Sequence, residues 1–315
     1  MRRHAQVERM LADAERTRRC AFGGNKALRS AFERRAAAGV LARVFPNMYV
    51  DPQYWAALDP PDRTLHIVRT LHERHPQWVF AGLVAATVHG FEHQWSLHDG
   101  GVSIVSSDEN TASSLARVRR LYAPGCPAEI VDGLPVTGKP RTVVDCCMLF
   151  DFRFALPIMD SALRQGVTKR DIIATCGRLR ADCTDALRAL HYADVNSENG
   201  GESLMRGTII EAGLMVPQTQ VVFADPVSGK RYRADFAWRL DDGEIVVAEF
   251  DGARKYVDPA MTDGRSIHGV VQEEREREAA LMRAGVTRIV RCTFDDVILV
   301  DALICKLRSA GVPMR

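Results

Sequence analysis

Two strand-like segments near the C-terminal end of this 315-residue chain constrain its fold most strongly. Residues 231–239 and 244–251 are rich in the aromatic and β-branched side chains that favour strands. Between them stands Asp241-Asp242-Gly243, which fits a three-residue hairpin loop with glycine in the left-handed position. The segment therefore predicts an antiparallel hairpin.

The length of this loop decides which side chains share a face of the hairpin. A three-residue loop pairs Leu240 with Glu244, and counting back along both strands places Asp235 opposite Glu249. Asp251, two residues farther on, would then lie on the same face. A two-residue turn would shift the register by one residue and separate Asp235 from the other acids. The opposite face would be apolar and would pack into a core; it comprises Ala234, Phe236, Trp238, Val246, Ala248 and Phe250.

Three carboxylates on one face repel one another unless positive charge lies among them. A divalent cation, Mg²⁺ or Mn²⁺, held by Asp235, Glu249 and Asp251 would supply that charge and could activate water against a phosphodiester. Lys255 or Arg275 could neutralise the transition state. The alternative is a set of surface ion pairs with nearby cations, namely Arg231, Arg233, Arg254 and Lys255.

A helix expected over residues 271–284 places four side chains on one face, those of Glu274, Arg277, Glu278 and Leu281. The alternation of acid and base indicates an exposed ladder of ion pairs. Glu274 and Arg277 are nevertheless kept as residues that could support the acidic site, because this helix follows the acidic strand directly.

The N-terminal segment is strongly basic. Residues 1–43 contain eleven Lys or Arg against four Asp or Glu, in a chain whose formal net charge is +2. Two helices are expected over 4–19 and 25–38, followed by a hairpin that turns at Pro46-Asn47. A basic helix followed by a hairpin is the order of a winged helix-turn-helix, in which the helix enters the DNA major groove. The candidate DNA contacts are Lys26, Arg29, Arg34, Arg35 and Arg43. A solvated, arginine-rich helix face is the alternative.

The eight cysteines and the hydropathy pattern bear on the compartment. No CxxC or zinc-like spacing occurs, and several cysteines lie in apolar runs, as reduced, buried thiols do. No run approaches eighteen apolar residues, and no secretory leader is evident. We therefore expect a cytoplasmic protein with no membrane contact.

The C-terminal segment resembles a known superfamily. Glu202, Asp235 and the run Glu249-Phe250-Asp251-Gly252, with Lys255 beyond it, resemble the PD-(D/E)XK, restriction-endonuclease-like nucleases. The similarity is greater to the very-short-patch-repair-like branch, the DUF559 domain, whose downstream helix resembles residues 274–285 here. The resemblance implies a mixed sheet flanked by helices and a catalytic site that includes Glu202 and Lys255 beside the three acids. The superfamily pattern is Glu-x-Lys, whereas the third residue here is Asp251.

The upstream chain resembles abortive-infection (AbiEi-like) antitoxins of type IV toxin–antitoxin systems. Arg34-Arg35 through Tyr49 resembles their winged-helix segment, and 133–145 resembles their middle domain. Together the resemblances imply a multidomain α/β (α+β) protein. Its parts would be a winged-helix head (1–55), a mixed α/β middle domain (60–195) and a restriction-endonuclease-like domain (196–315).

Other polar groups of the middle segment have structural interpretations. Arg141 and Asp145 are spaced i, i+4 at a helix start, which favours an ion pair. His89, His93 and His98 lack metal-ligand spacing and are interpreted as loop or core histidines.

Three functions stay open at this stage. The first is an antitoxin-like transcriptional regulator that binds duplex DNA and carries a degenerate nuclease-like domain, as the basic head and the missing lysine suggest. The second is an active Mg²⁺-dependent DNA endonuclease of phage defence or DNA repair. The third is a protein whose acidic face binds a cognate toxin.

Overall fold

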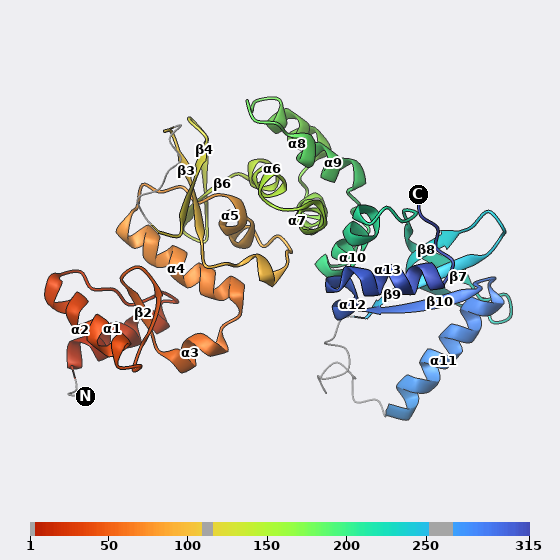
Figure 1. Ribbon diagram of the computed structural model, residues 1–315, viewed down its shortest axis with the longest axis horizontal. Coiled ribbons are helices and arrows are strands. Elements are labelled where there is room, and N and C mark those ends of the chain that lie inside the picture. Colours follow the sequence, from red (N-terminus) through yellow and green to blue (C-terminus); the bar gives the residue numbers. More distant parts are fainter. Residues whose placement is uncertain (1–3, 109–115, 252–266) are drawn as a thin grey trace. The chain divides into compact units, whose positions relative to one another are not determined.

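The computed structural model describes residues 4–108, 116–251 and 267–315 and has a mixed α/β fold (Figure 1). Its residues form two compact units that interleave along the chain. Unit 1 consists of Met1–Leu149 and Val167–Cys183, and unit 2 of Phe150–Gly166 and Thr184–Arg315. No helix among the described residues is both long and apolar enough to cross a lipid bilayer. The finer division into three domains stays a prediction.

Unit 1 begins with the expected order of two helices and a hairpin. These elements are α1 (Ala5–Arg16), α2 (Lys26–Ala37), β1 (Ala42–Phe45) and β2 (Met48–Val50). Asn25 caps α2 by accepting a hydrogen bond from the backbone N–H of Leu28. The hairpin turns where Asn47 adopts φ +55°, a conformation that asparagine tolerates better than most residues. Phe32 of α2 stacks on Tyr49 of β2 with ring centroids 5.0 Å apart, which joins helix and hairpin.

The remainder of unit 1 packs helices against short strand pairs. Its elements are α3 (Pro52–Ala57), α4 (Pro60–Arg74), α5 (Gly82–Val88), a 3-10 helix (Trp95–Leu97), β3 (Val102–Ser106), β4 (Val118–Tyr122), β5 (Ala128–Val131), β6 (Leu134–Thr137), α6 (Lys139–Leu149) and α8 (Lys169–Cys176). β3 and β4 are parallel, and β5 and β6 are antiparallel. Phe80 bridges both pairs, to Ile104 and to Val136, and is fully buried in their common core.

Unit 2 contains one four-stranded mixed sheet. Its elements are α7 (Phe152–Arg164), α9 (Thr184–Tyr192), α10 (Gly200–Glu211), β7 (Gln218–Ala224), β8 (Arg231–Arg239), β9 (Ile245–Asp251), α11 (Ile267–Arg283), β10 (Arg288–Thr293), α12 (Phe294–Ile298) and α13 (Val300–Ser309). The strand order is β10-β9-β8-β7, with β10 parallel to β9 and the other pairs antiparallel.

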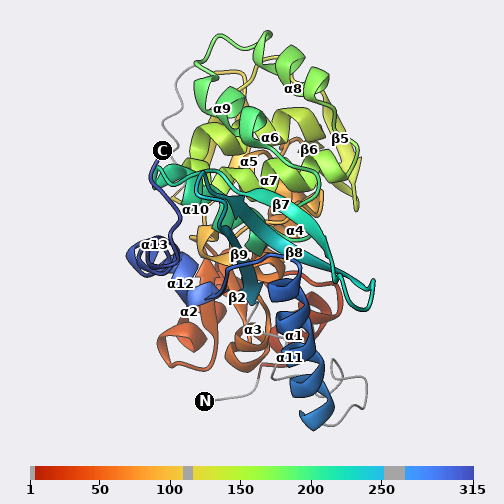
Figure 2. The ribbon, with the colours of Figure 1, turned by 90° about the vertical axis from the view of Figure 1, so that its right-hand side faces the viewer.

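Helices cover both faces of this sheet, with α12 and α13 on one side and α11 on the other (Figures 1 and 2). Phe236, Trp238 and Val246 pack with α10, α12 and α13. Ala237 and Val247 pack with α11 on the other side. Because both faces are covered, the polar ends of the strands are where this unit can expose a site.

The predicted three-residue loop of the β8–β9 hairpin is confirmed. The backbone N–H of Leu240 donates to the carbonyl of Glu244 at 2.9 Å, and Gly243 adopts φ +88°. The observed register runs from Arg239 with Ile245 back to Phe236 with Ala248.

One residue of the predicted apolar face packs differently. Ala234 is buried, but it joins the α11-side cluster with Tyr232 and not the cluster of Phe236. The β7–β8 pairing is interrupted between these two residues, opposite Asp235, where Gln220 of β7 adopts φ +53°. The alternation of side chains between the two faces of β8 is therefore interrupted at Asp235.

Candidate functional site

The candidate site of unit 2 begins at the N-terminus of α10. Asn199 is the N-cap, and its Oδ1 accepts from the backbone N–H groups of Gly201 at 2.9 Å and Glu202 at 3.0 Å. This cap fixes Glu202 in the first helical turn, where the helix dipole favours a negative charge. An asparagine followed three residues later by a glutamate is the sequence signal for this arrangement.

The Glu202 carboxylate is buried, with 4% of the residue exposed. It accepts hydrogen bonds from Asn199 Nδ2 at 2.7 Å, from the backbone N–H of Glu198 at 2.9 Å and from Gln220 Nε2 at 2.9 Å. All three donors are neutral. The pKa of Glu202 is raised to about 7, mainly by burial and in part by the nearby carboxylate of Asp235.

Asp235 lies on β8 where the ladder to β9 ends. Its Oδ2 accepts the backbone N–H of Phe250 at 2.9 Å, so a side chain takes the place of a strand-to-strand bond. Extending the register by one pair beyond Phe236 and Ala248 places Asp235 opposite Glu249, as the loop length predicted. The carboxylate of Asp235 is also close enough to Glu202 of α10 to raise the pKa of that group.

Glu249 differs from Glu202 because a cation neutralises it. Arg277 of α11 forms an ion pair with Glu249 and donates a second bond to the carbonyl of Arg233 at 2.7 Å. In the parallel register Arg291 of β10 stands beside Glu249, and it pairs with Glu274 and Glu278 of α11 at 2.5 and 2.8 Å. The predicted ladder along α11 is thus wrong in its partners, because these side chains pair with the sheet and not with one another.

The remaining predicted site residues are Asp251, Arg275 and Lys255. Asp251 is half-buried opposite Thr293, and its side chain forms no hydrogen bond or ion pair within the described part of the chain. Arg275 is exposed on α11. Lys255 and Arg254 lie outside the described residues.

Gln220 is a site residue that sequence reasoning missed. Its φ of +53° is unusual for a residue other than glycine, and such backbone strain is concentrated at functional sites. Its Nε2 is bonded to Glu202, whereas its Oε1 is buried with no partner among the described residues. Nothing in the run Gln218–Ala224 distinguishes it from an ordinary strand residue.

The donor set suits a hard divalent cation. Glu202, Asp235 and the unpartnered Oε1 of Gln220 are all oxygen ligands, and Mg²⁺ is commonly held by one or two carboxylates with water completing its shell. Across residues 4–108, 116–251 and 267–315, no three His, Cys, Asp or Glu side chains form a ready cluster for a metal ion. The group that fits a cation is therefore two acids and an amide.

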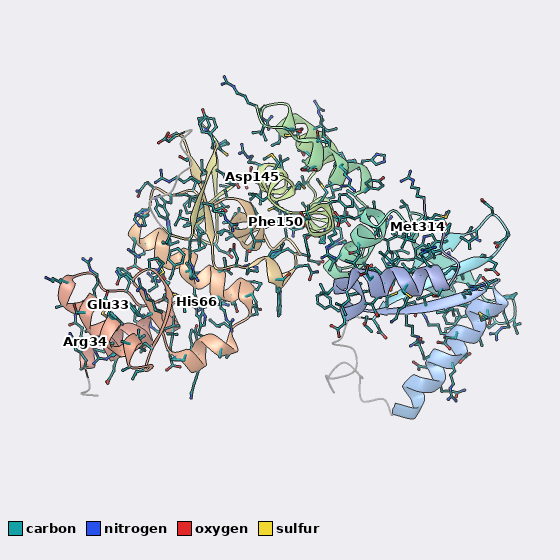
Figure 3. All side chains as sticks on the ribbon, viewed as in Figure 1. Glu33, Arg34, His66, Asp145, Phe150 and Met314 are labelled. Carbon is teal, nitrogen blue, oxygen red and sulfur yellow. The ribbon has the colours of Figure 1, made fainter. Side chains whose placement is uncertain are left out.

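The predicted DNA-contact residues lie on α2 and the β1–β2 hairpin of unit 1. Lys26, Arg29 and Arg43 are exposed on α2 and β1. Arg34 is also exposed, on α2 (Figure 3). None of these four forms an ion pair with a described residue. Arg35 differs, because it is half-buried and donates to the carbonyl of Ala31 at 2.9 Å, within its own helix.

Neighbouring arginines of the same head are occupied in holding unit 1 together. Arg18 pairs with Asp62 at 2.6 Å, and Arg19 pairs with Glu73, so both attach the head to α4. In residues 1–55, Arg18 and Arg19 therefore form ion pairs inside unit 1. The exposed cations of α2 and β1 do not.

Comparison with models of protein families, with curated proteins and with solved structures finds no match.

Proposed function

We propose that this chain is a duplex-DNA-binding, antitoxin-like transcriptional regulator with a PD-(D/E)XK-type C-terminal domain. The observation that carries the proposal is the set of four exposed, unpaired cations on α2 and β1, namely Lys26, Arg29, Arg34 and Arg43. Unpaired cations on a rigid helix–hairpin surface neutralise phosphates and release counterions, which supplies most of the affinity of non-specific DNA binding.

Duplex-DNA binding of the full chain, measured by fluorescence anisotropy at several salt concentrations, tests this proposal. The variant Arg29→Glu/Arg34→Glu should weaken binding at least about tenfold and reduce the salt slope by about 2, one for each lost phosphate contact. The matched control is Arg170→Glu/Arg308→Glu, which makes the same charge change at two exposed arginines of α8 and α13. Equal losses in both variants would show that net charge, and not this surface, determines affinity.

A second candidate function is a Mg²⁺- or Mn²⁺-dependent DNA endonuclease. The observation in its favour is Glu202, buried among neutral donors and next to Asp235. A bound divalent ion would activate water and stabilise charge on a phosphodiester. Glu202, Asp235 and Gln220 would hold the ion, and Glu249 would be kept from it by its ion pair with Arg277.

Nicking of supercoiled plasmid in Mg²⁺ or Mn²⁺ tests the enzyme. An active enzyme should lose nicking in Asp235→Asn and Glu202→Gln and keep it in Asp241→Asn, a loop acid outside the site. Wild-type protein that nicks no more than Asp235→Asn would leave the regulator as the function of the chain.

A further inference from the structure

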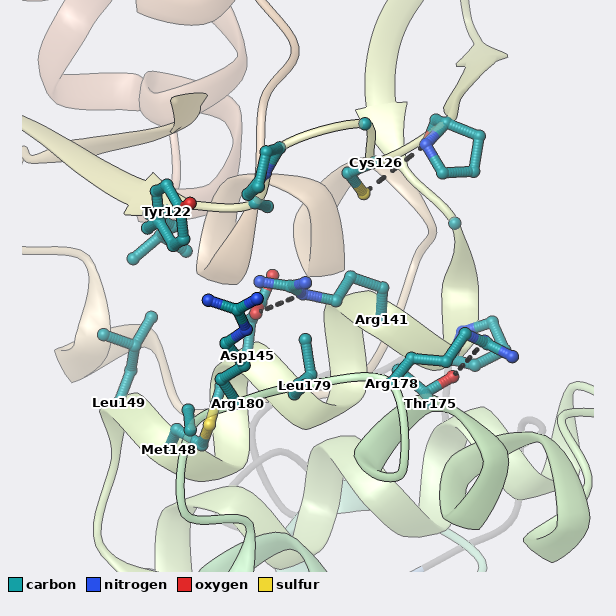
Figure 4. A pocket seen from close by; sticks show the side chains of 18 of the residues that line it. Tyr122, Cys126, Arg141, Asp145, Met148, Leu149, Thr175, Arg178, Leu179 and Arg180 are labelled. Carbon is teal, nitrogen blue, oxygen red and sulfur yellow. Dashed lines mark hydrogen bonds and ion pairs between the residues drawn. The ribbon is translucent and has the colours of Figure 1, made fainter. Parts of the chain in front are cut away.

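Unit 1 contains a pocket that neither the DNA-binding surface nor the acidic site uses. It lies between the end of β4 with the loop after it, one side of α6, and the segment that follows α8 (Figure 4). Its volume is about 890 Å³, within the range of small-molecule sites. All its lining residues belong to unit 1.

The charged lining is mainly basic. Four arginines contribute to the wall against two acids, Glu129 and Asp145. The arginines are Arg120, Arg141, Arg178 and Arg180. Guanidinium groups bind phosphate through paired, charge-assisted hydrogen bonds, so this wall favours an anion.

Asp145 provides the most specific feature of the pocket. Its side chain is 2% exposed, and its Oδ1 accepts from Arg141 Nε at 2.7 Å, which confirms the predicted ion pair. Its Oδ2 is buried and has no hydrogen-bond partner among the described residues. A buried acceptor without a donor is unfavourable, and a ligand that brings an N–H or O–H group would satisfy it.

Unused donors lie close to this acceptor. Figure 4 shows the guanidinium groups of Arg141 and Arg180 directed toward the Asp145 carboxylate. Arg180 is exposed and forms no ion pair in the described part of the chain, and Arg120 Nε is buried without a partner. The site therefore offers positive donors on both sides of a single free carboxylate oxygen.

The rest of the wall is apolar. Leu121, Tyr122, Pro124, Leu149 and Leu179 contribute to it, and Tyr122 is 39% exposed, so its ring is available for stacking. A ligand that matches the pocket combines a flat, weakly polar group, a hydrogen-bond donor on that group, and a phosphate.

We propose that this pocket binds a nucleotide, with the base against the apolar wall, a base N–H donated to Oδ2 of Asp145, and the phosphate held by Arg180, while Arg141 stays paired with Asp145. This binding is independent of the function proposed above, because it uses neither the cations of α2 nor the acids of unit 2.

Isothermal titration calorimetry of the full chain with the four nucleoside monophosphates tests the proposal. At least one should bind, and inorganic phosphate, ribose 5-phosphate and the matching nucleoside should each bind at least about tenfold more weakly, because each lacks part of the recognised set. Ribose 5-phosphate that binds as tightly as the nucleotide would overturn the assignment, as would no binding of any nucleotide at millimolar concentration.

Matched variants locate the site. Arg180→Ala should weaken nucleotide binding about tenfold, the loss typical of a charge-assisted hydrogen bond. Arg170→Ala, an exposed arginine of α8 outside the pocket, should leave it unchanged. Asp145→Asn should also weaken binding while retaining the thermal unfolding transition. Equal affinity in the Arg180→Ala and Arg170→Ala proteins would overturn the proposal.

Discussion

Unit 2 buries two acidic side chains in opposite ways. Asp160 of α7 is fully buried and accepts from Arg206 at 2.6 Å and from the backbone N–H of Asp194 at 2.8 Å. Glu202, only 4% exposed, accepts from neutral donors alone and lies close to a second carboxylate, Asp235. Burial raises the pKa of both carboxyl groups, but Arg206 opposes the rise at Asp160.

Arg206 of α10 could pair with either acid, and in the structure it pairs with Asp160 alone. Arg206 stands one turn after Glu202 on α10, the spacing at which the two would pair on an isolated helix. Its guanidinium is directed to Asp160 and to the carbonyl of Tyr192 instead. Asp160 is therefore paired with a cation, whereas Glu202 is a buried carboxyl group with a raised pKa, of the kind that is concentrated at functional sites.

The largest effect on stability is expected from breaking the ion pair between Arg206 and Asp160. Arg206→Met should lower the free energy of unfolding by about 3–5 kcal/mol, because it leaves Asp160 buried without a cation. Urea denaturation at pH 8 measures this. In the same assay Glu202→Gln should not lower stability, since it removes an unfavourable charge. A similar loss in both variants would mean that the two acids are equivalent.

The next largest effect is expected in the pH dependence of stability, which should differ between the wild type and Glu202→Gln. Its pKa of about 7 in the folded state lies above the ordinary value of 4.5, so the folded state binds more protons between these pH values. Stability contributed by this group is present below pH 4.5 and is lost as pH rises through 7. Relative to Glu202→Gln, the wild type should lose about 2–3 kcal/mol between pH 4.5 and pH 8. Parallel pH profiles of the two proteins would contradict the burial of a protonated Glu202.

Divalent cations should produce a smaller stabilisation. At a concentration ten times its dissociation constant, Mg²⁺ or Mn²⁺ should stabilise the wild type by about 1.4 kcal/mol at pH 8. Thermal unfolding followed by circular dichroism measures this shift. Glu202→Gln and Asp235→Asn should lose it, and Asp241→Asn should keep it. A shift that persists in all three variants would place the cation elsewhere.

The smallest effect is expected from removing Arg277, the ion-pair partner of Glu249. Arg277→Met should destabilise the chain by at most about 1 kcal/mol, because its ion pair with Glu249 is partly exposed. Freed of this partner, Glu249 should raise the affinity for Mn²⁺ a few-fold, measured by titration calorimetry. Unchanged or weaker Mn²⁺ binding would show that Glu249 is not part of the cation site.

Local sequence rules predicted the backbone around the site well. The left-handed glycine of the Asp241-Asp242-Gly243 loop determined the register of β8 and β9, because hairpin geometry depends on the loop alone. The two helices and the hairpin of the head followed from side-chain periodicity and from turn residues in the same way.

Side-chain partners were less predictable. The helix spacing of Glu274, Arg277 and Glu278 indicated pairs within α11, but sheet residues compete for the same charges. β4 and α3 were not expected, since a short segment with mixed polarity acquires its structure from neighbours that lie far away in the sequence. The pocket beside Asp145 depends on three such distant segments.

The sequence by itself determined the loop and the register of the β8–β9 hairpin, and the cap at Asn199 that places Glu202 in a helix's first turn. These relations are local, and turn and cap chemistry decides them. Only the tertiary structure decided that Arg206 forms an ion pair with Asp160 and Arg277 with Glu249. It also decided that Glu202 accepts hydrogen bonds from neutral donors alone. Burial and charge pairing depend on which elements pack together, because desolvation and Coulomb energy act between groups that are close in space and not in sequence.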